Sequence, residues 1–114
     1  DSGGSLADSL QRLNYGKPDA KRAACREVAA FGAPGAPQLA RVLQVERDVS
    51  VREACVDALG SLGSKAREAI PVLEYLINDP PAVNPNANKD ELAAEMRELD
   101  LLKRMKAALA KIKG

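Results

Sequence analysis

The chain of 114 residues has no histidine and no tryptophan, and its aromatic side chains are limited to Tyr15, Phe31 and Tyr75. Without histidine it lacks the commonest general base and the Ser-His and Cys-His pairs that activate a nucleophile. It also lacks a P-loop and a dinucleotide-binding glycine motif, because its glycine-containing segments are too short. Carboxylate pairs such as Glu95 and Glu98 fall on faces expected to be solvated. We therefore expect no enzyme, no cofactor and no bound metal ion.

The chain also has little net charge and no long apolar run. Lys and Arg total 17 and Asp and Glu total 16, which gives a formal net charge of +1. No field of one sign therefore draws the chain to nucleic acid or to an anionic membrane. No apolar run approaches the roughly 18 residues needed to span a bilayer. Because the first residue is Asp rather than Met, we expect a soluble protein that is either processed after export or a fragment of a longer chain. The compartment stays open.

Cysteine is scarce, and its two occurrences have two interpretations. Cys25 and Cys55 form no CxxC motif, and without histidine they make no zinc-finger spacing. They can be buried free thiols, which behave as small hydrophobic residues. They can also form a disulfide, which would indicate an oxidising compartment. The sequence leaves both interpretations open.

The residues that are present repeat with the period of an α-helix. In the segment VREACVDALGSLG, residues 51–63, apolar side chains recur at i, i+3, i+4, i+7, i+8 and i+11. Ser50 and Glu53 predict a capping box at the start of this helix, and Gly63 predicts its end. A partner helix is predicted over 66–79, where Pro71 falls in the first two turns and is tolerated.

An earlier segment has the same pattern. The sequence AKRAACREVAAFG, residues 20–32, overlays 51–63 with a constant shift, so that Val28 matches Leu59 and Gly32 matches Gly63. The match extends to the segment that follows each copy. Once a gap of three residues is allowed, Pro37, Leu39 and Val42 match Pro71, Leu73 and Leu76. Two helical hairpins with a period near thirty residues are typical of a helical-repeat protein.

These motifs resemble a known family. The pattern V-R-x-x-A-x-x-A-L-G-x-L-G at 51–63, followed by Ala-Ile-Pro-x-Leu at 69–73, is similar to the short HEAT-like repeats of phycobilin-lyase-type proteins. The resemblance covers residues 20–79, and the first copy departs from the motif at Lys21 and Ala29. It implies an α-solenoid of the kind usually used to bind proteins. It also implies a pairing of Asp48 with Arg52 across the turn between repeats. No bilin pocket is recognisable.

The predicted fold is all-α: one domain, 1–114, that forms a short α-solenoid of two HEAT-like hairpins between capping helices. The segments are an N-terminal capping helix at 5–15, repeat 1 at 19–46, repeat 2 at 49–79, a loop at 80–88 and a long C-terminal helix at 89–113. The end helices are expected to cover the faces that two repeats leave open. Asn88 and Glu91 predict a capping box for the last helix. Gly60, Ala54 and Ala58 are expected where neighbouring helices approach closely.

The last helix carries two apolar stripes rather than one. The first stripe contains Leu92, Met96 and Leu99, and the second contains Leu101, Met105, Leu109 and Ile112. At about 100° per residue their centres lie well over 100° apart. Either the helix bends or breaks near Asp100, or its second half packs on something else, such as the first helix, a second copy or another partner. We therefore take the second stripe as a candidate interface, including one for a homo-oligomer.

The function expected from these features is a non-catalytic protein–protein interaction scaffold whose partner is another protein of unknown identity. The second helices of the hairpins would present the contact residues. The candidates are Arg41, Gln44, Glu68 and Tyr75. Arg41 and Tyr75 occupy equivalent positions in the overlay. An exposed tyrosine is a frequent contact residue, although Tyr75 could equally be half-buried between the repeats.

Two other functions are compatible with parts of the sequence. The first is binding to a nucleic-acid backbone through the basic end of the last helix. Its residues would be Lys103, Arg104, Lys106, Lys111 and Lys113, with Arg22 and Arg26 if they converge. The net charge of +1 and the few aromatic residues make nucleic acid an unfavoured partner. The second is a structural or oligomerising segment of a larger protein.

Overall fold

The computed structural model describes residues 5–79 and 84–114, and within them it contains helices and turns but no strand. The α-helices are α1 (Leu6–Tyr15), α2 (Pro18–Ala30), α3 (Ala36–Val45), α4 (Val49–Leu62), α5 (Ile70–Asn78) and α6 (Lys89–Lys113). Two short 3₁₀ segments, η1 (Ala33–Gly35) and η2 (Gly63–Ala69), join the helices within the hairpins. The prediction of an all-α fold is confirmed.

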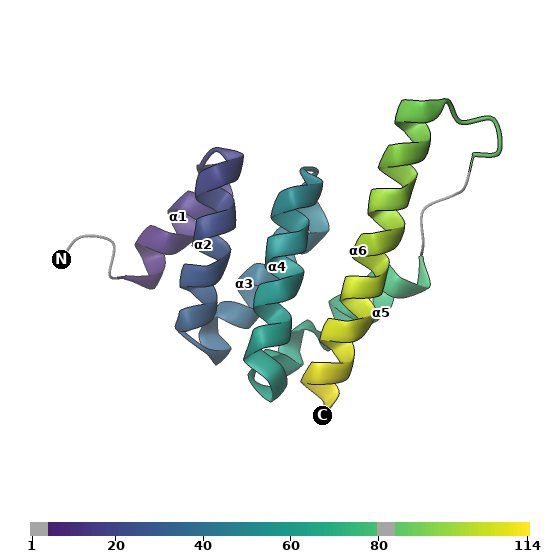
Figure 1. The fold of residues 1–114 in the computed structure, drawn as a ribbon. Helices are drawn as coiled ribbons and strands as arrows, with labels where there is room; N and C mark the ends of the chain where they lie inside the picture. Colours follow the sequence, from purple (N-terminus) through teal and green to yellow (C-terminus); the bar gives the residue numbers. More distant parts are fainter. Residues whose placement is uncertain (1–4, 80–83) are drawn as a thin grey trace.

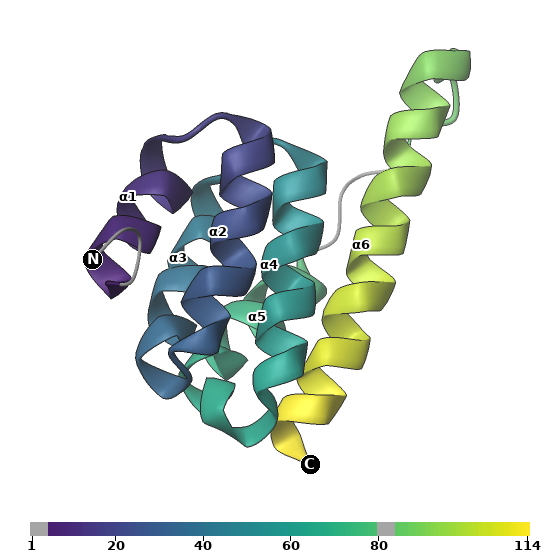
Figure 2. The same cartoon turned by 60° about the vertical axis from the view of Figure 1, so that its left-hand side comes forward.

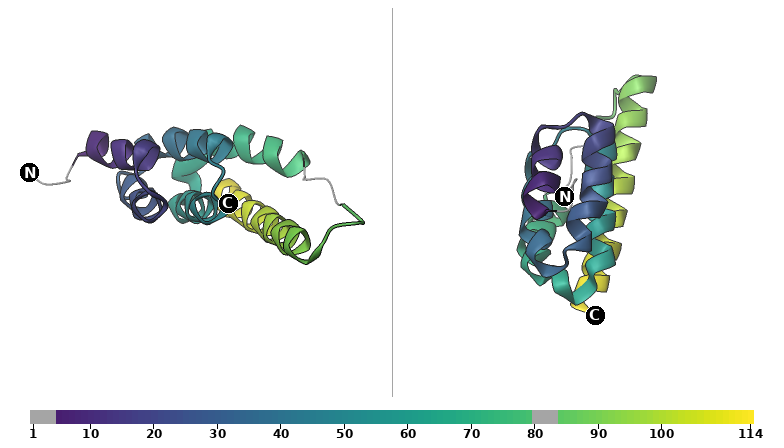
Figure 3. Two further views of the ribbon diagram at one scale, coloured as in Figure 1. Left: turned by 90° about the horizontal axis from the view of Figure 1, so that it is seen from above. Right: turned by 90° about the vertical axis from the view of Figure 1, so that its left-hand side faces the viewer.

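The helices form two layers. Helices α2, α4 and α6 lie side by side in one layer, and α1, α3 and α5 form the other (Figure 1 and Figure 3). Successive helices alternate between the layers, as expected for a short α-solenoid. The molecule measures 52 × 32 × 16 Å along its principal axes, and the shortest dimension accommodates two layers of helices. The first half of α6 extends beyond the other helices (Figure 2).

One continuous apolar core runs between the layers and holds them together. Its largest fully buried side chains include Leu13, Leu39, Leu43, Leu59, Leu73, Leu101 and Ile112. Gly60 on α4 marks the close approach to α6, because a Cβ atom added there would lie 3.4 Å from the Cβ atom of Ala108. The predicted role of Gly60 in close helix packing is confirmed.

The two hairpins turn at equivalent glycines. Gly32 follows the end of α2 with φ of 80°, and Gly63 follows α4 with φ of 57°. Side chains disfavour these positive φ values, whereas glycine adopts them readily. The shared conformation supports the overlay of 20–32 on 51–63 and explains why both helices end at the same place in the repeat.

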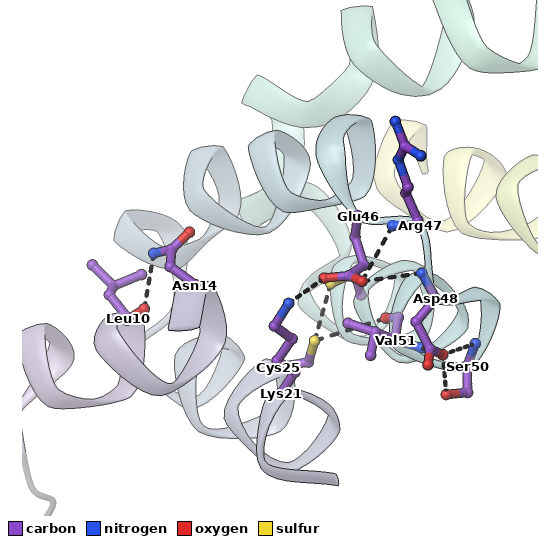
Figure 4. A network of polar contacts seen from close by, with 10 residues as sticks. Leu10, Asn14, Lys21, Cys25, Glu46, Arg47, Asp48, Ser50 and Val51 are labelled. Carbon is purple, nitrogen blue, oxygen red and sulfur yellow. Dashed lines mark hydrogen bonds and ion pairs between the residues drawn. The ribbon is translucent and has the colours of Figure 1, made fainter. Parts of the chain in front are cut away.

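The start of α4 differs from the prediction. Its cap is Asp48, whose Oδ1 accepts hydrogen bonds from the backbone N–H groups of Ser50 (2.9 Å) and Val51 (3.3 Å) (Figure 4). The Ser50 hydroxyl instead accepts a hydrogen bond from Arg22 at 2.7 Å and donates one to Asp48. The predicted capping box of Ser50 and Glu53 is therefore wrong, because a carboxylate two residues earlier takes the free N–H groups.

The pairing of Asp48 with Arg52, implied by the family resemblance, is not formed through their side chains. The Asp48 carboxylate is occupied by the cap, and the Arg52 guanidinium lies 3.3 Å from the carboxylate of Glu98 on α6. Arg52 Nε also donates to the carbonyl oxygen of Leu43 at 3.4 Å. Arg52 therefore connects α4 to α6 and to the end of α3.

A second carboxylate closes the turn between the repeats. Glu46 accepts a hydrogen bond from Lys21 Nζ at 2.7 Å and from the backbone N–H groups of Arg47 and Asp48 (Figure 4). Partial burial acts to raise the pKa of Glu46, but these bonds outweigh it and hold the pKa below its ordinary value of 4.5. The hydrogen bond from the Ser50 hydroxyl likewise leads the contacts that lower the pKa of Asp48, against a smaller opposing effect of burial.

The second hairpin contains a shorter α-helix than the sequence predicts. The predicted helix over 66–79 becomes α-helical only at Ile70, and the residues before it form η2. Pro71 explains this start, because its ring would clash with the carbonyl of Arg67 if the α-helix extended further upstream. Glu68 consequently lies in η2 and not on the second helix of the hairpin.

Helix α6 is continuous over Lys89–Lys113, so it does not break near Asp100. The predicted capping box is confirmed: the Asn88 side chain accepts from the N–H of Glu91 at 2.8 Å, and the Glu91 side chain accepts from the N–H of Asn88 at 3.3 Å. The predicted loop at 80–88 falls partly outside the described residues, at 80–83.

Candidate protein-binding surfaces

An open groove with a volume of about 1050 Å³ lies between α2 and α4. Its lining includes the small side chains of Ala29, Ala54 and Ala58, together with Leu62 and several polar residues. Because these side chains are short, the two helices pack closely without filling the space between their outer edges. The groove is lined by residues of α2, α4, the adjoining turns and Arg104 of α6, and by none from α3 or α5.

Charged side chains line the walls of this groove, and most are paired. Arg22 binds the carboxylate of Asp19, and Arg104 of α6 binds Asp57 at 2.8 Å. Arg26 and Lys65 differ, because neither forms an ion pair with any described residue. These two cations therefore remain available to an acidic group entering the groove. The groove was not predicted from the sequence, although alanines repeating on facing helices were a signal of it.

The second-helix face carries three of the four predicted contact residues. Arg41 and Gln44 are exposed on α3, and Tyr75 is 62% exposed on α5. Tyr75 is thus a surface side chain rather than packing between repeats. Glu68, the fourth residue, is exposed in η2. Val45, the last residue of α3, is also exposed on the surface, at 67%, and was not among the contact residues predicted from the sequence.

The candidate interface on the second stripe of α6 is corrected by the structure. Leu101, Met105 and Ile112 are at most 3% exposed, and Leu109 packs against the same core. This half of α6 contacts α4, α5 and η2, so the stripe serves the interior of the chain itself.

The stripe left on the surface is the first one. Leu92, Met96 and Leu99 are 51%, 59% and 41% exposed. They belong to the first half of α6, whose N-terminal end extends beyond the other helices (Figure 2). The sequence identified both stripes but assigned the exposed role to the wrong one.

The basic end of α6 is partly neutralised by neighbouring helices. Arg104 binds Asp57 of α4, and Lys113 binds Glu74 of α5 at 2.8 Å. Lys103, Lys106 and Lys111 remain without an ion pair among the described residues. The basic surface available for phosphate groups is therefore smaller than the sequence indicates.

The described residues show no arrangement of His, Cys, Asp and Glu side chains that could hold a metal ion. In the same part of the chain, every helix is too short or too polar to cross a bilayer.

Comparison with known proteins identifies the family. Residues 6–84 match the family model for HEAT repeats, which covers more than half of the chain, and the chain belongs to this family. The match does not distinguish a phycobilin-lyase type from other HEAT repeats. No curated protein and no solved structure matches the chain. HEAT repeats are generally protein-interaction scaffolds and are generally not catalytic.

Proposed function

We propose that the chain is a protein-interaction module that binds a segment of another protein in the groove between α2 and α4. The observation that carries this proposal is an open groove whose lining combines alanine side chains with two cations, Arg26 and Lys65, that form no ion pair with a described residue. Small-molecule sites commonly measure about 300–1,000 Å³ and enclose most of the ligand. A groove of about 1050 Å³ that opens to solvent suits a peptide segment better.

The charges of the groove define the chemistry of the segment. Arg26 and Lys65 can each form a charge-assisted hydrogen bond with a carboxylate, which is stronger than a neutral one. The alanine side chains of the lining accept apolar side chains without leaving polar atoms unpaired. The segment is therefore expected to combine apolar residues with Asp or Glu.

The test is a selection of peptides from a displayed random library on the immobilised chain, followed by affinity measurement. The expected peptides contain acidic residues, and their affinity falls in the double variant Arg26→Glu/Lys65→Glu. The matched control is Arg47→Glu, a charge reversal at an exposed residue that does not line the groove, and it is expected to retain the affinity. Peptides whose affinity is unchanged by the groove variant, or is lost equally in the control, would contradict the proposal.

The second-helix face is a second candidate surface for the same function. An exposed tyrosine at the position equivalent to Arg41 gives neighbouring helices two side chains able to contact a partner. The double variant Arg41→Ala/Tyr75→Ala is expected to weaken binding of a protein partner without changing the helical circular dichroism signal. Equal loss of partner binding and of the helical circular dichroism signal would indicate that Arg41 and Tyr75 have a structural role.

Nucleic-acid binding through α6 is less supported, because Arg104 and Lys113 already bind carboxylates. Phosphate contacts would produce binding that weakens steeply as salt increases. We expect no binding of duplex DNA even at low ionic strength, and a titration by fluorescence anisotropy measures this directly.

A further inference from the structure

The first half of α6 presents a continuous apolar stripe that the rest of the described chain does not cover. Leu92, Met96 and Leu99 follow one another at spacings of four and three residues and are all exposed. Contiguous exposed apolar side chains rimmed by polar residues commonly mark an interaction site.

The orientation of this stripe is fixed by ion pairs at the back of the helix. Arg97 lies 3.5 Å from Glu53, and Glu98 lies 3.3 Å from Arg52, both on α4. At about 100° per residue, the stripe is centred roughly 175° from the face that α6 packs on α4. Rotation of α6 to bury the stripe would break both ion pairs and expose the core residues of its second half. The stripe is therefore held outward.

Acidic residues dominate the surroundings of the stripe. Residues 89–100 contain two basic and five acidic side chains, a net charge of −3. On the same helical estimate, Glu95 flanks the stripe on one side and Asp100 on the other, each about 70° from its centre. Neither forms an ion pair with a described residue. Glu95 Oε1 accepts a hydrogen bond from the backbone N–H of Asn84 at 2.9 Å, which leaves the charge of the carboxylate without a cationic partner in the described chain.

We infer that the first half of α6 binds a basic amphipathic helix of another protein. The apolar face of that helix would cover Leu92, Met96 and Leu99, as in other helix recognition through i, i+3, i+4 and i+7 contacts. Lys or Arg side chains on its flanks would meet Glu95 and Asp100. This surface is separate from the groove and does not depend on the function proposed for it.

The same charges disfavour the other occupants. In an antiparallel pair of two copies centred on Met96, the two Glu95 carboxylates would lie on the same edge of the interface, and like charges placed together oppose association. An anionic membrane would be repelled by the acidic flanks in the same way.

The test uses two synthetic amphipathic peptides of equal length, one of Leu and Lys and one of Leu and Glu, each with apolar residues at helical spacing. The full chain is expected to bind the Leu/Lys peptide more tightly. The double variant Met96→Gln/Leu99→Gln is expected to lose about tenfold or more in affinity. Tyr15→Gln, a change at another exposed hydrophobic residue outside the proposed binding surfaces, is expected to leave the affinity unchanged.

A charge reversal tests recognition in a way that loss of folding cannot imitate. The double variant Glu95→Lys/Asp100→Lys is expected to prefer the Leu/Glu peptide. Binding that ignores the Met96→Gln/Leu99→Gln variant, or a preference that does not reverse, would overturn the proposal. The proposal would also be overturned if the chain self-associated in sedimentation, or bound lipid vesicles, and the Met96→Gln/Leu99→Gln variant abolished that association. The Arg26→Glu/Lys65→Glu variant is expected to keep the Leu/Lys preference, which separates this surface from the groove.

Discussion

Cys25 of α2 and Cys55 of α4 lie with their Sγ atoms 3.0 Å apart, and neither side chain is exposed to solvent. Both are free thiols, so the interpretation as buried thiols is confirmed and the two repeats touch through them. The hydrogen bond with Cys25, together with burial, raises the pKa of the Cys55 thiol. Since the thiolate is the reactive form, Cys55 is protected both by packing and by its raised pKa, and Cys25 is protected by packing.

The thiols are therefore expected to react slowly in the native chain. At mildly alkaline pH, a maleimide reagent should label neither cysteine until the chain opens, and should label both once it is unfolded in urea. Mass spectrometry of timed samples measures the labelling. Rapid labelling of one cysteine in the native chain would show that the contact between the repeats opens easily.

Replacement of the Asp48 cap is expected to destabilise the chain more than replacement of Ser50. Asp48→Ala leaves two N–H groups of α4 without their acceptor, at a cost of about 1 kcal/mol of unfolding free energy. Ser50→Ala removes only side-chain contacts with Asp48 and Arg22. Urea denaturation of both variants gives the comparison. A larger loss of unfolding free energy in Ser50→Ala than in Asp48→Ala would show that Ser50 is the effective cap of α4.

Acid is expected to weaken the turn between the repeats through Glu46. Its pKa is lowered in the folded chain, so its stabilising contribution is complete above the ordinary value of 4.5 and is lost as the pH falls through the lower, folded value. Glu46→Gln should therefore have a lower unfolding free energy at neutral pH and a smaller loss in acid than the unmodified chain. Denaturation at a series of pH values from 7 to about 3 tests this. Glu68→Gln is the matched control, at an exposed residue in η2 that forms no ion pair with a described residue, and should leave the unfolding free energy at neutral pH unchanged.

The contact of Gly60 with Ala108 is expected to limit the size of the side chain at position 60. Gly60→Ala gains helix propensity of about 1 kcal/mol, and its Cβ would lie 3.4 Å from that of Ala108, at the short limit of ordinary contact, so a stabilisation of at most about 1 kcal/mol is expected. Gly60→Leu would force α4 and α6 apart, with a loss of about 1–3 kcal/mol in unfolding free energy. Thermal denaturation measures the difference. Addition of Ala108→Gly should recover part of the loss, and no recovery would place the clash elsewhere.

Local patterns in the sequence predict the repeats well. The apolar spacing of 51–63 and its copy at 20–32 identify the first helices, and Gly32 and Gly63 mark their ends, because these signals depend on neighbouring residues alone. The start of α4 was harder to predict, since Asp48 and Ser50 are both good caps and compete for the same N–H groups. A sequence pattern cannot rank two such acceptors.

Relationships between distant segments were not predictable. Arg52 binds Glu98, which lies far along the chain, and this choice depends on where α6 lies against α4. The same placement decides which stripe of α6 is buried, so the sequence could identify two stripes but not assign them. The groove depends on the distance between α2 and α4, and alanine periodicity alone does not give that distance.

The arrangement in two layers has a consequence for how many partners the chain can hold at once. The groove belongs to the layer of α2 and α4, and Arg41 and Tyr75 belong to the layer of α3 and α5. Ligands on these two faces would lie on opposite sides of a slab whose shortest dimension is 16 Å, and neither would block the other. With partners bound on both of the surfaces proposed above, the chain would hold two proteins within two helix diameters of each other.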